Sequence, residues 1–385
     1  MMDTSSVDGF LAKALRDLRA GKAAVWPFDS AANWQSVWSR IEYHGIPLAL
    51  HHHAGNLGDW PPPLLGRIAE EARLIVLWET THHDAIAKVL EQLQAAEIEA
   101  VVMKGTALAY SFHDEPATRR RGDTDLLVRP NNQARTRAIL SRLGWYRKDD
   151  PHGLYYQEGW LHDAAGFFVH SIDLHWEPSD RPVLHSLLPI ENFFARKQPM
   201  PRFGEGAFRP DTATMILHAA TNQKWHAQHG YDAEDGRLTS PKRLIWSVDF
   251  DLMTASMDSE DWDRLTEHCT REGAGPLVAD ALRGAQEDLG TALPEGPLAK
   301  LEGAPLSRDL ETYFSDADSL SQFWLDLRKT KGLAKKGRLI AARGLAPRDH
   351  LVEKYPSAKG WPTAALQGRL WFATAGRLLR RMVSS

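Results

Sequence analysis

The sequence lacks the features that mark secreted and membrane-spanning proteins. Its 385 residues include a single cysteine, Cys269, so no internal disulfide can form, which fits a reducing compartment. No run of 18 apolar residues occurs, and the amino-terminal stretch MMDTSSVDGFLAKALRDL carries Asp3 and Asp8 instead of the apolar core of a signal peptide. We therefore expect a soluble, cytoplasmic protein with no integral membrane segment.

The chain also lacks a strong net charge. Its formal charge is −4, with 25% charged and 43% hydrophobic residues, and this ordinary balance gives no reason to invoke nucleic acid as a partner for the whole chain. One segment departs from it, because residues 328–385 hold 14 Lys or Arg against Asp349 and Glu353. This basic tail could contact nucleic acid or a membrane surface. A solvated helical face is the commoner explanation of such charge.

The chain is too long for one small core. Changes in the spacing of its apolar residues divide it into three regions. Residues 1–96 show helical spacing. In residues 97–210, short β-branched runs alternate with helical stretches, and residues 211–385 are helical again, ending in the basic tail. We predict an α+β fold in which a small mixed-sheet core, 97–210, lies between helical N- and C-terminal regions, 1–96 and 211–385.

Within the central part, the elements can be placed more closely. Strands are predicted at 98–103 and 123–128, and a helix at 130–143, which ends at Gly144. A β-hairpin is predicted from 154–162 and 167–176.

Two aspartates open the second of these strands, in the stretch RRRGDTDLLVRP. Asp123 and Asp125 are two residues apart, so on a strand both side chains lie on the same face. Neighbouring like charges repel, and the arrangement therefore requires a cation. That cation is either the arginine run 119–121 or a metal ion.

A third carboxylate lies on the second strand of the hairpin. In FFVHSIDLHW, Asp173 and His175 share one strand face, and Asp173 would meet Asp123 and Asp125 if the two strands were neighbours. Three carboxylates form the oxygen-rich site that Mg²⁺ prefers, with nucleotide phosphates completing the coordination. Two such ions, about 3.5–4 Å apart, can activate an attacking hydroxyl and stabilise leaving pyrophosphate.

A glycine turn precedes the aspartates. Lys104, Gly105 and Thr106 join a strand to a helical stretch, and such a junction presents backbone N–H groups and a helix N-terminus to phosphate. Gly105 permits close approach, Thr106 adds a hydroxyl, and Lys104 adds charge for a triphosphate. Strand–glycine–helix turns are common, so the tripeptide alone is weak evidence for a phosphate site. The evidence becomes stronger because the turn is followed in order by a helix, the paired aspartates and the third aspartate.

In this order of motifs, MKGTALAY, RRRGDTDLLV and IDLHW, the chain resembles the polymerase-β-like nucleotidyltransferase superfamily. It is most similar to the uncharacterised bacterial nucleotidyltransferase family, whose members carry KGxAL, RxxGDxDLLV and DLHW, and it also looks like toxin-type relatives with KGGTxL and RxSxDxD. The resemblance covers residues 97–177, with weaker similarity in the flanking helices. It departs from the superfamily at the turn, where a Gly-Ser pair is replaced by Gly105-Thr106.

The resemblance implies a reaction and a site. The reaction is transfer of an NMP group from an NTP to a hydroxyl of an acceptor, with release of pyrophosphate. Asp123, Asp125 and Asp173 would be the catalytic carboxylates and would bind two Mg²⁺ ions, with Mn²⁺ as the alternative, and Asp173 would also assist deprotonation of the acceptor. The nucleotide would be bound by Lys104, Gly105, Thr106, Arg119 and His175.

Several other polar residues have simpler explanations. The triplet 51–53 consists of adjacent histidines, which rarely converge on one ion, so we expect a partly exposed loop. His82 and His83 are interpreted in the same way, without a metal. Arg120 and Arg121 are expected at the surface.

Two further sets of residues stay open. His175 is equally well explained as a packed strand residue. His218, Asn222 and His226 follow at i, i+4 and i+8 and share one helix face. That face could contact a base or an acceptor, but packing is the commoner explanation.

The acceptor is not encoded in these motifs, and three classes of function remain. An enzyme that modifies a small molecule or peptide is favoured and requires a closed pocket between the core and the helices. A toxin-like enzyme acting on tRNA or protein would inhibit growth in a manner relieved by Asp123→Ala, with a salt-sensitive role for the basic tail. A non-catalytic nucleotide-binding scaffold would bind NTP without turnover, and the intact acidic triad argues against it.

Overall fold

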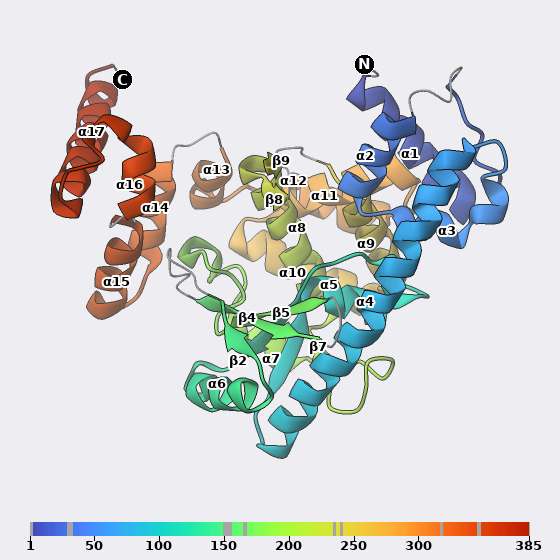
Figure 1. Ribbon diagram of the computed structural model, residues 1–385, viewed down its shortest axis with the longest axis horizontal. Helices are drawn as coiled ribbons and strands as arrows, with labels where there is room; N and C mark the ends of the chain where they lie inside the picture. The colour runs from blue at the N-terminus through green and yellow to red at the C-terminus, as the bar shows by residue number, and fades with distance from the viewer. Residues whose placement is uncertain are drawn as a thin grey trace.

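The computed structural model of the protein shows a small mixed sheet set among helices, as predicted for an α+β chain (Figure 1). It describes residues 3–28, 34–148, 156–164, 168–233, 236–238, 242–315, 319–344 and 348–384.

The strands are β1 Ala100–Met103, β2 Thr124–Val128, β3 Tyr146–Arg147, β4 Gln157–Asp163, β5 Val169–His175, β6 Gln198–Pro199, β7 Phe208–Arg209, β8 Tyr231–Ala233 and β9 Gly236–Leu238. The α-helices are α1 Thr4–Arg19, α2 Trp34–His44, α3 Pro47–His52, α4 Pro62–Ala95, α5 Lys104–Ser111, α6 Gln133–Arg142, α7 Ile190–Ala195, α8 Thr212–His229, α9 Leu244–Ala255, α10 Ser259–Glu272, α11 Gly275–Leu289, α12 Glu295–Gly303, α13 Arg308–Phe314, α14 Ser319–Lys329, α15 Leu333–Gly344, α16 Arg348–Lys354 and α17 Thr363–Ser384.

The main sheet has five strands in the order β1-β2-β5-β4-β3. The β2–β5 pair is parallel and the other pairs are antiparallel. All five residues of β2 are buried, which explains its continuous apolar run. Because β2 and β5 are neighbours, the condition set in the sequence analysis is met, and Asp125 lies directly beside Asp173 in the register.

The predicted strands and hairpin are confirmed with small shifts of boundary. The second strand begins at Thr124, so Asp123 belongs to the turn before it. The hairpin pairs β4 with β5, with Trp160 opposite Ile172. Part of its predicted first strand, 154–155, and part of its turn, 165–167, lie outside the described residues.

The helix predicted at 130–143 begins with a 3₁₀ turn and is α-helical from Gln133 to Arg142. Gly144 follows it with φ of +83°, a left-handed conformation that glycine adopts without a steric cost.

The histidine triplet does not form the predicted loop. Residues 51 and 52 belong to α3 and His53 follows its end, and all three keep some exposure to solvent. The helix forms because Pro47 stands in its first turn, where no backbone N–H is needed, and because Leu48 and Leu50 are buried.

Two apolar cores meet along α4. The larger core joins the sheet, α5, α6 and the second half of α4 to helices α8 and α10–α13. The smaller one joins α1–α3 and the start of α4 to Leu244 and Val248 of α9 and Leu289 of α11. Helix α4, about 51 Å long at 1.5 Å per residue, runs from one core to the other (Figure 1). The division at residues 96 and 210 stays a prediction.

The basic tail forms helices α15–α17, which stand together with α14 at one end of the molecule (Figure 1). Helices α16 and α17 share a small cluster of Leu351, Ala358 and Leu366. Among the residues that the structure describes, no helix combines the length and the apolar character needed to cross a bilayer.

The closest helix packing in the larger core occurs at Gly275, at the start of α11. A Cβ atom there would lie 2.5 Å from the Leu301 carbonyl oxygen and 2.7 Å from the Ala304 Cβ on the neighbouring chain segment. Gly284, on the same helix, has open space where a methyl group would be added.

We therefore expect Gly275→Ala to lower the free energy of unfolding by about 1–3 kcal/mol through overpacking. Gly284→Ala is the matched control and should be neutral or stabilising by up to about 1 kcal/mol, because alanine is the better helix former. Urea denaturation followed by circular dichroism measures both. Equal effects of the two substitutions would contradict this packing.

Candidate active site

The parallel pairing of β2 and β5 brings an acidic cluster together on these two strands. Potential ligand atoms of Asp125, Asp173 and His175 all lie within 4.8 Å of one another. His175 Nε2 donates a hydrogen bond of 2.9 Å to Asp125 Oδ1. Both residues are buried, whereas Asp173 keeps partial exposure. His175 is therefore a packed strand residue that also orients a site carboxylate.

The carboxylates of the cluster affect one another electrostatically. Burial, together with the charges of Asp125 and Asp173, holds the pKa of Asp123 above its ordinary value. Burial and the charge of Asp125 likewise raise the pKa of Asp173. Burial opposes ionisation of Asp125 too, but the ammonium group of Lys104 and the hydrogen bond from His175 outweigh it and lower its pKa. Burial is thus the main obstacle to ionisation of Asp123 and Asp173, and a cation held between the carboxylates would oppose it.

Lys104 is the cation in direct contact with this cluster. Its Nζ lies 2.5 Å from Asp125 Oδ1, and the three aspartates raise its pKa although burial lowers it. Its φ of +48° is left-handed, a conformation that costs a non-glycine residue about 1–3 kcal/mol and that often occurs at functional sites. Asp125, with Asp173 and His175 beside it, could hold a metal ion next to this ammonium group.

The arginine run does not neutralise the paired aspartates. Each arginine instead pairs with a carboxylate on a helix: Arg119 with Asp249, Arg120 with Glu71 and Arg121 with Glu79. The surface prediction was wrong for Arg121, whose side chain is only 3% exposed, whereas that of Arg120 is 37% exposed. The reason is that Glu79, buried on α4, needs a buried partner.

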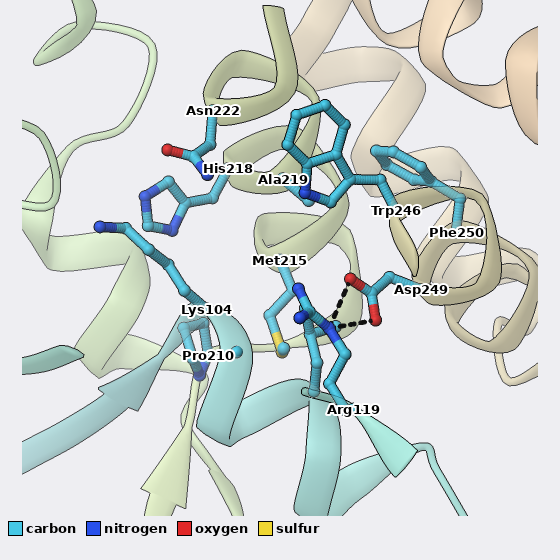
Figure 2. Close-up of a pocket in the computed structure, with 12 residues that line it drawn as sticks. Lys104, Arg119, Pro210, Met215, His218, Ala219, Asn222, Trp246, Asp249 and Phe250 are labelled. Carbon is cyan, nitrogen blue, oxygen red and sulfur yellow. Dashed lines mark hydrogen bonds and ion pairs between the residues drawn. The ribbon is translucent and has the colours of Figure 1, made fainter. Parts of the chain in front are cut away.

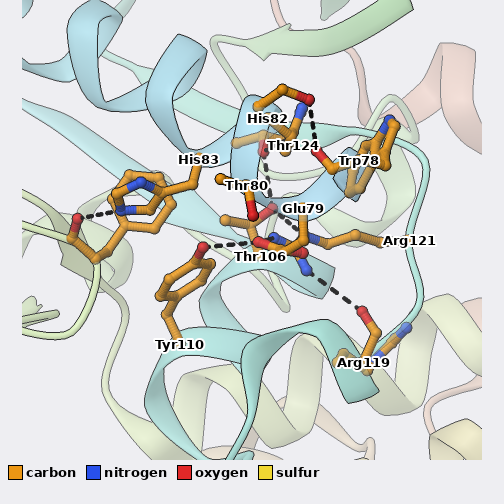
Figure 3. Close-up of polar contacts among 12 residues, drawn as sticks. Trp78, Glu79, Thr80, His82, His83, Thr106, Tyr110, Arg119, Arg121 and Thr124 are labelled. Carbon is orange, nitrogen blue, oxygen red and sulfur yellow. Dashed lines mark hydrogen bonds and ion pairs between the residues drawn. The ribbon is translucent and has the colours of Figure 1, made fainter. Parts of the chain in front are cut away.

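A hydrogen-bond network continues from this ion pair (Figure 3). Arg121 Nε donates to the Thr106 hydroxyl at 2.9 Å, which lies 2.8 Å from the Thr124 hydroxyl. Thr124 is in turn hydrogen-bonded to His82 Nε2 at 2.8 Å. The network ties the starts of β2 and α5 to α4. The Thr106 hydroxyl, predicted for phosphate, is buried in these contacts, so a contact from Thr106 to phosphate would have to use its backbone.

A pocket of about 510 Å³ lies beside Lys104 (Figure 2). Helices α5, α8 and α9 supply most of its wall: Lys104, Gly105, Leu108, Met215, His218, Ala219, Asn222, Trp246, Asp249 and Phe250, with Arg119 and Pro210 completing it. Arg119 Nε donates to both oxygens of Asp249, at 2.8 and 2.9 Å. Burial and the charge of Lys104 lower the pKa of His218 to about 3, so its imidazole is neutral.

A second pocket, of about 380 Å³, lies on the other side of Lys104, His218 and Asn222, which line both. Its remaining wall comes from β4, α8 and the segment after β5: Gln157, Pro178, Ser179, Asp180, Arg181, Leu184, Leu188, Thr221 and Trp225. Gln157 Nε2 donates to Asp173 Oδ2 at 3.3 Å. This second pocket therefore adjoins the third carboxylate, whereas the first adjoins the glycine turn.

The structure thus places the predicted site residues in three groups. Lys104, Asp123, Asp125, Asp173 and His175 come together in or beside the acidic cluster. Gly105 and Arg119 line the first pocket. Only the side chain of Thr106 is used elsewhere.

Sequence reasoning missed most of the pocket walls. Trp246, Asp249 and Phe250 follow at i, i+3 and i+4, one face of α9, a spacing that could have singled them out. On α8, His218 and Asn222 do line the pockets, whereas His226 Nδ1 contacts the Gly230 carbonyl near the end of the helix.

The arginine pairs give a matched test of the network. Removing Arg121 leaves the Glu79 carboxylate buried without its cation, so Arg121→Met should lower the free energy of unfolding by about 3–5 kcal/mol. Arg120→Met, at the more exposed ion pair, should lower the free energy of unfolding by about 1 kcal/mol or less. Guanidinium denaturation measures both values. A similar small loss in both variants would show that the Arg121–Glu79 pair does not hold β2 to α4.

Comparison with known proteins agrees with this geometry. A family model described as "uncharacterised nucleotidyltransferase" matches residues 30–290, about two thirds of the chain, including the sheet, the acidic cluster and both pockets. A search of curated proteins found no match. The shared stretch shows that this chain belongs to that nucleotidyltransferase family.

Proposed function

We propose that the protein is a Mg²⁺-dependent enzyme that transfers the NMP group of an NTP to a hydroxyl of an acceptor and releases pyrophosphate. The observation that carries the proposal is the pairing of Asp125 with Asp173 across parallel strands, next to Lys104, which lines both pockets. Family membership supports nucleotidyl transfer in general. The metal, the acceptor and the assignment of one pocket to each substrate are our proposals.

The donor set fits a divalent cation. Asp123, Asp125 and Asp173 supply oxygen ligands, and a cation would favour the ionised forms of Asp123 and Asp173, whose pKa values are raised by burial and by the charge of Asp125. These residues would hold one or two Mg²⁺ ions, with Mn²⁺ as the alternative. When bound, the metal supplies charge stabilisation at the reacting phosphate and lowers the pKa of the attacking hydroxyl.

The remaining chemistry falls to the side chains around the cluster. Asp173 accepts the proton of the acceptor hydroxyl, and Gln157 orients its carboxylate. The hydroxyl oxygen forms a bond to the α-phosphorus, while the bond from that phosphorus to the bridging oxygen breaks and pyrophosphate leaves. Lys104, at the border of the first pocket, places a positive charge next to the triphosphate.

The two pockets suit the two substrates. The first borders Gly105 at the N-terminus of α5 and offers apolar and aromatic surface, so we assign it to the nucleotide. The second reaches Asp173 through Gln157, so we assign it to the acceptor. A pocket with polar and apolar side chains next to Asp173 supports a small-molecule or peptide acceptor over the toxin-like and scaffold alternatives.

Asp123→Asn tests the acidic cluster. The neutral amide removes the charge repulsion that raises the pKa of Asp123, so the ligand-free variant should melt at or above the temperature of the wild type. Binding of an NTP should raise the melting temperature of the wild type only with Mg²⁺ or Mn²⁺, by mass action. The variant should lose this response.

The matched control is Asp84→Asn, an exposed carboxylate on α4, which should keep the response. The measurement is thermal unfolding with each of the four NTPs, with and without the metal. If the wild type responds to no NTP in the presence of metal, or if Asp123→Asn responds as fully as the wild type, the proposal fails.

Substitutions in the two pockets test their assignment. Trp246→Ala removes an aromatic face from the first pocket and should weaken NTP binding by about tenfold, as expected when one stacking partner is lost. Trp246→Phe should restore most of the affinity. Arg181→Ala, in the second pocket, should leave NTP affinity unchanged. Calorimetric titration with the stabilising NTP measures these values. The opposite pattern would assign the nucleotide to the second pocket.

A further inference from the structure

Exposed apolar side chains gather at the carboxy-terminal end of the chain. Among the described residues, a large share of the exposed large hydrophobic side chains lies in helices α14–α17 and their connections: Trp324, Leu333, Ile340, Trp361, Trp371 and Phe372. Leu333 and Phe372, at 88% and 83%, are more exposed than any other large apolar side chain described. These helices contribute no residue to the two pockets of the site. Their apolar side chains therefore need an explanation outside nucleotidyl transfer.

Helix α15 carries an exposed apolar face with a basic residue beside it. Leu333 and Ile340 are seven residues, about two turns, apart and so lie on one face. Lys336, three residues after Leu333 and four before Ile340, lies beside this face and keeps some exposure, whereas Leu339 is buried and anchors the helix. The helix contains four basic residues and no acidic one.

Helix α17 repeats this combination. Leu366 is buried and Leu370 packs against the same small cluster, which fixes the inner side of the helix. Trp371 and Phe372 are exposed, at 54% and 83%. The sequence of this helix also contains four arginines and no acidic residue.

The mixture of side chains favours a lipid surface over a nucleic acid. Basic residues would serve either partner, and aromatic rings could stack on bases. Exposed aliphatic side chains such as Leu333 and Ile340 have no partner in a phosphate backbone, but the boundary between headgroups and acyl chains of a bilayer takes them. Anionic headgroups attract nearby Lys and Arg by about 1 kcal/mol each.

We propose that α15 and α17 bind the surface of a membrane that contains anionic lipid. Leu333, Ile340 and Phe372 enter the interfacial region, and Lys336 of α15 and Arg369, three residues before Phe372 on α17, contact lipid phosphates. The protein then lies on one leaflet, held by its tail, with the nucleotidyltransferase core outside the bilayer.

The test is co-sedimentation of the full-length protein with vesicles of phosphatidylcholine alone or mixed with phosphatidylglycerol. We expect binding to the mixed vesicles only, weakened by salt. Lys336→Gln/Arg369→Gln should reduce the partition coefficient on the order of 30-fold, since two charges are removed. Leu333→Ser/Ile340→Ser should reduce it by at least about tenfold.

Val76→Ser/Leu77→Ser, which changes two exposed apolar residues of α4, is the matched control and should bind as the wild type does. Thermal unfolding checks that every variant is folded. Absence of binding to the mixed vesicles overturns the proposal. So does unchanged binding by Leu333→Ser/Ile340→Ser, which would indicate charge adsorption alone. Loss of binding to RNA oligonucleotides in the charge variant, without vesicle binding by the wild type, would identify a nucleic-acid surface instead.

Discussion

The site depends on one constraint, the parallel pairing of β2 with β5. This pairing puts the carboxylates of Asp125 and Asp173 side by side on two inner strands of the sheet, where uncompensated charge is costly. Lys104 and His175 both contact the same oxygen of Asp125 and make its ionisation favourable. Burial and neighbouring charge oppose the ionisation of Asp123 and Asp173. A bound cation would favour the ionised form of both, which is why the cluster suits a metal ion.

Helix α4 fixes the chain around Asp123. Its buried Glu79 holds Arg121, and its His82 holds Thr124, so both sides of Asp123 are anchored to one long helix. The arginine run is thereby distributed over α4 and α9 rather than directed at the aspartates. Because Arg121 and Thr124 on both sides of Asp123 are held in place, the backbone cannot move to separate Asp123 from the other carboxylates, and the repulsion between them remains.

The helical regions contribute the shape of the site. Helix α8 lies between two pockets, with His218 and Asn222 facing both, and α9 closes the first pocket with Trp246, Asp249 and Phe250. The carboxylates of the sheet thus determine what chemistry is feasible, and the helices determine what can approach them. Helices α15–α17 line neither pocket and expose Leu333, Ile340 and Phe372, which suits a role in placing the enzyme rather than in the reaction.

The sequence by itself determined the local pattern: the α+β class, the strands and hairpin of the core, the shared face of Asp173 and His175, and the family, because period, turn residues and motifs are short-range features. Only the tertiary structure decided which charges meet. Lys104 reaches Asp125 across 21 residues, and Arg119 reaches Asp249 across 130. Ion pairs and pocket walls join residues distant in the chain, and a choice among several nearby arginines depends on which buried carboxylate the fold presents to each.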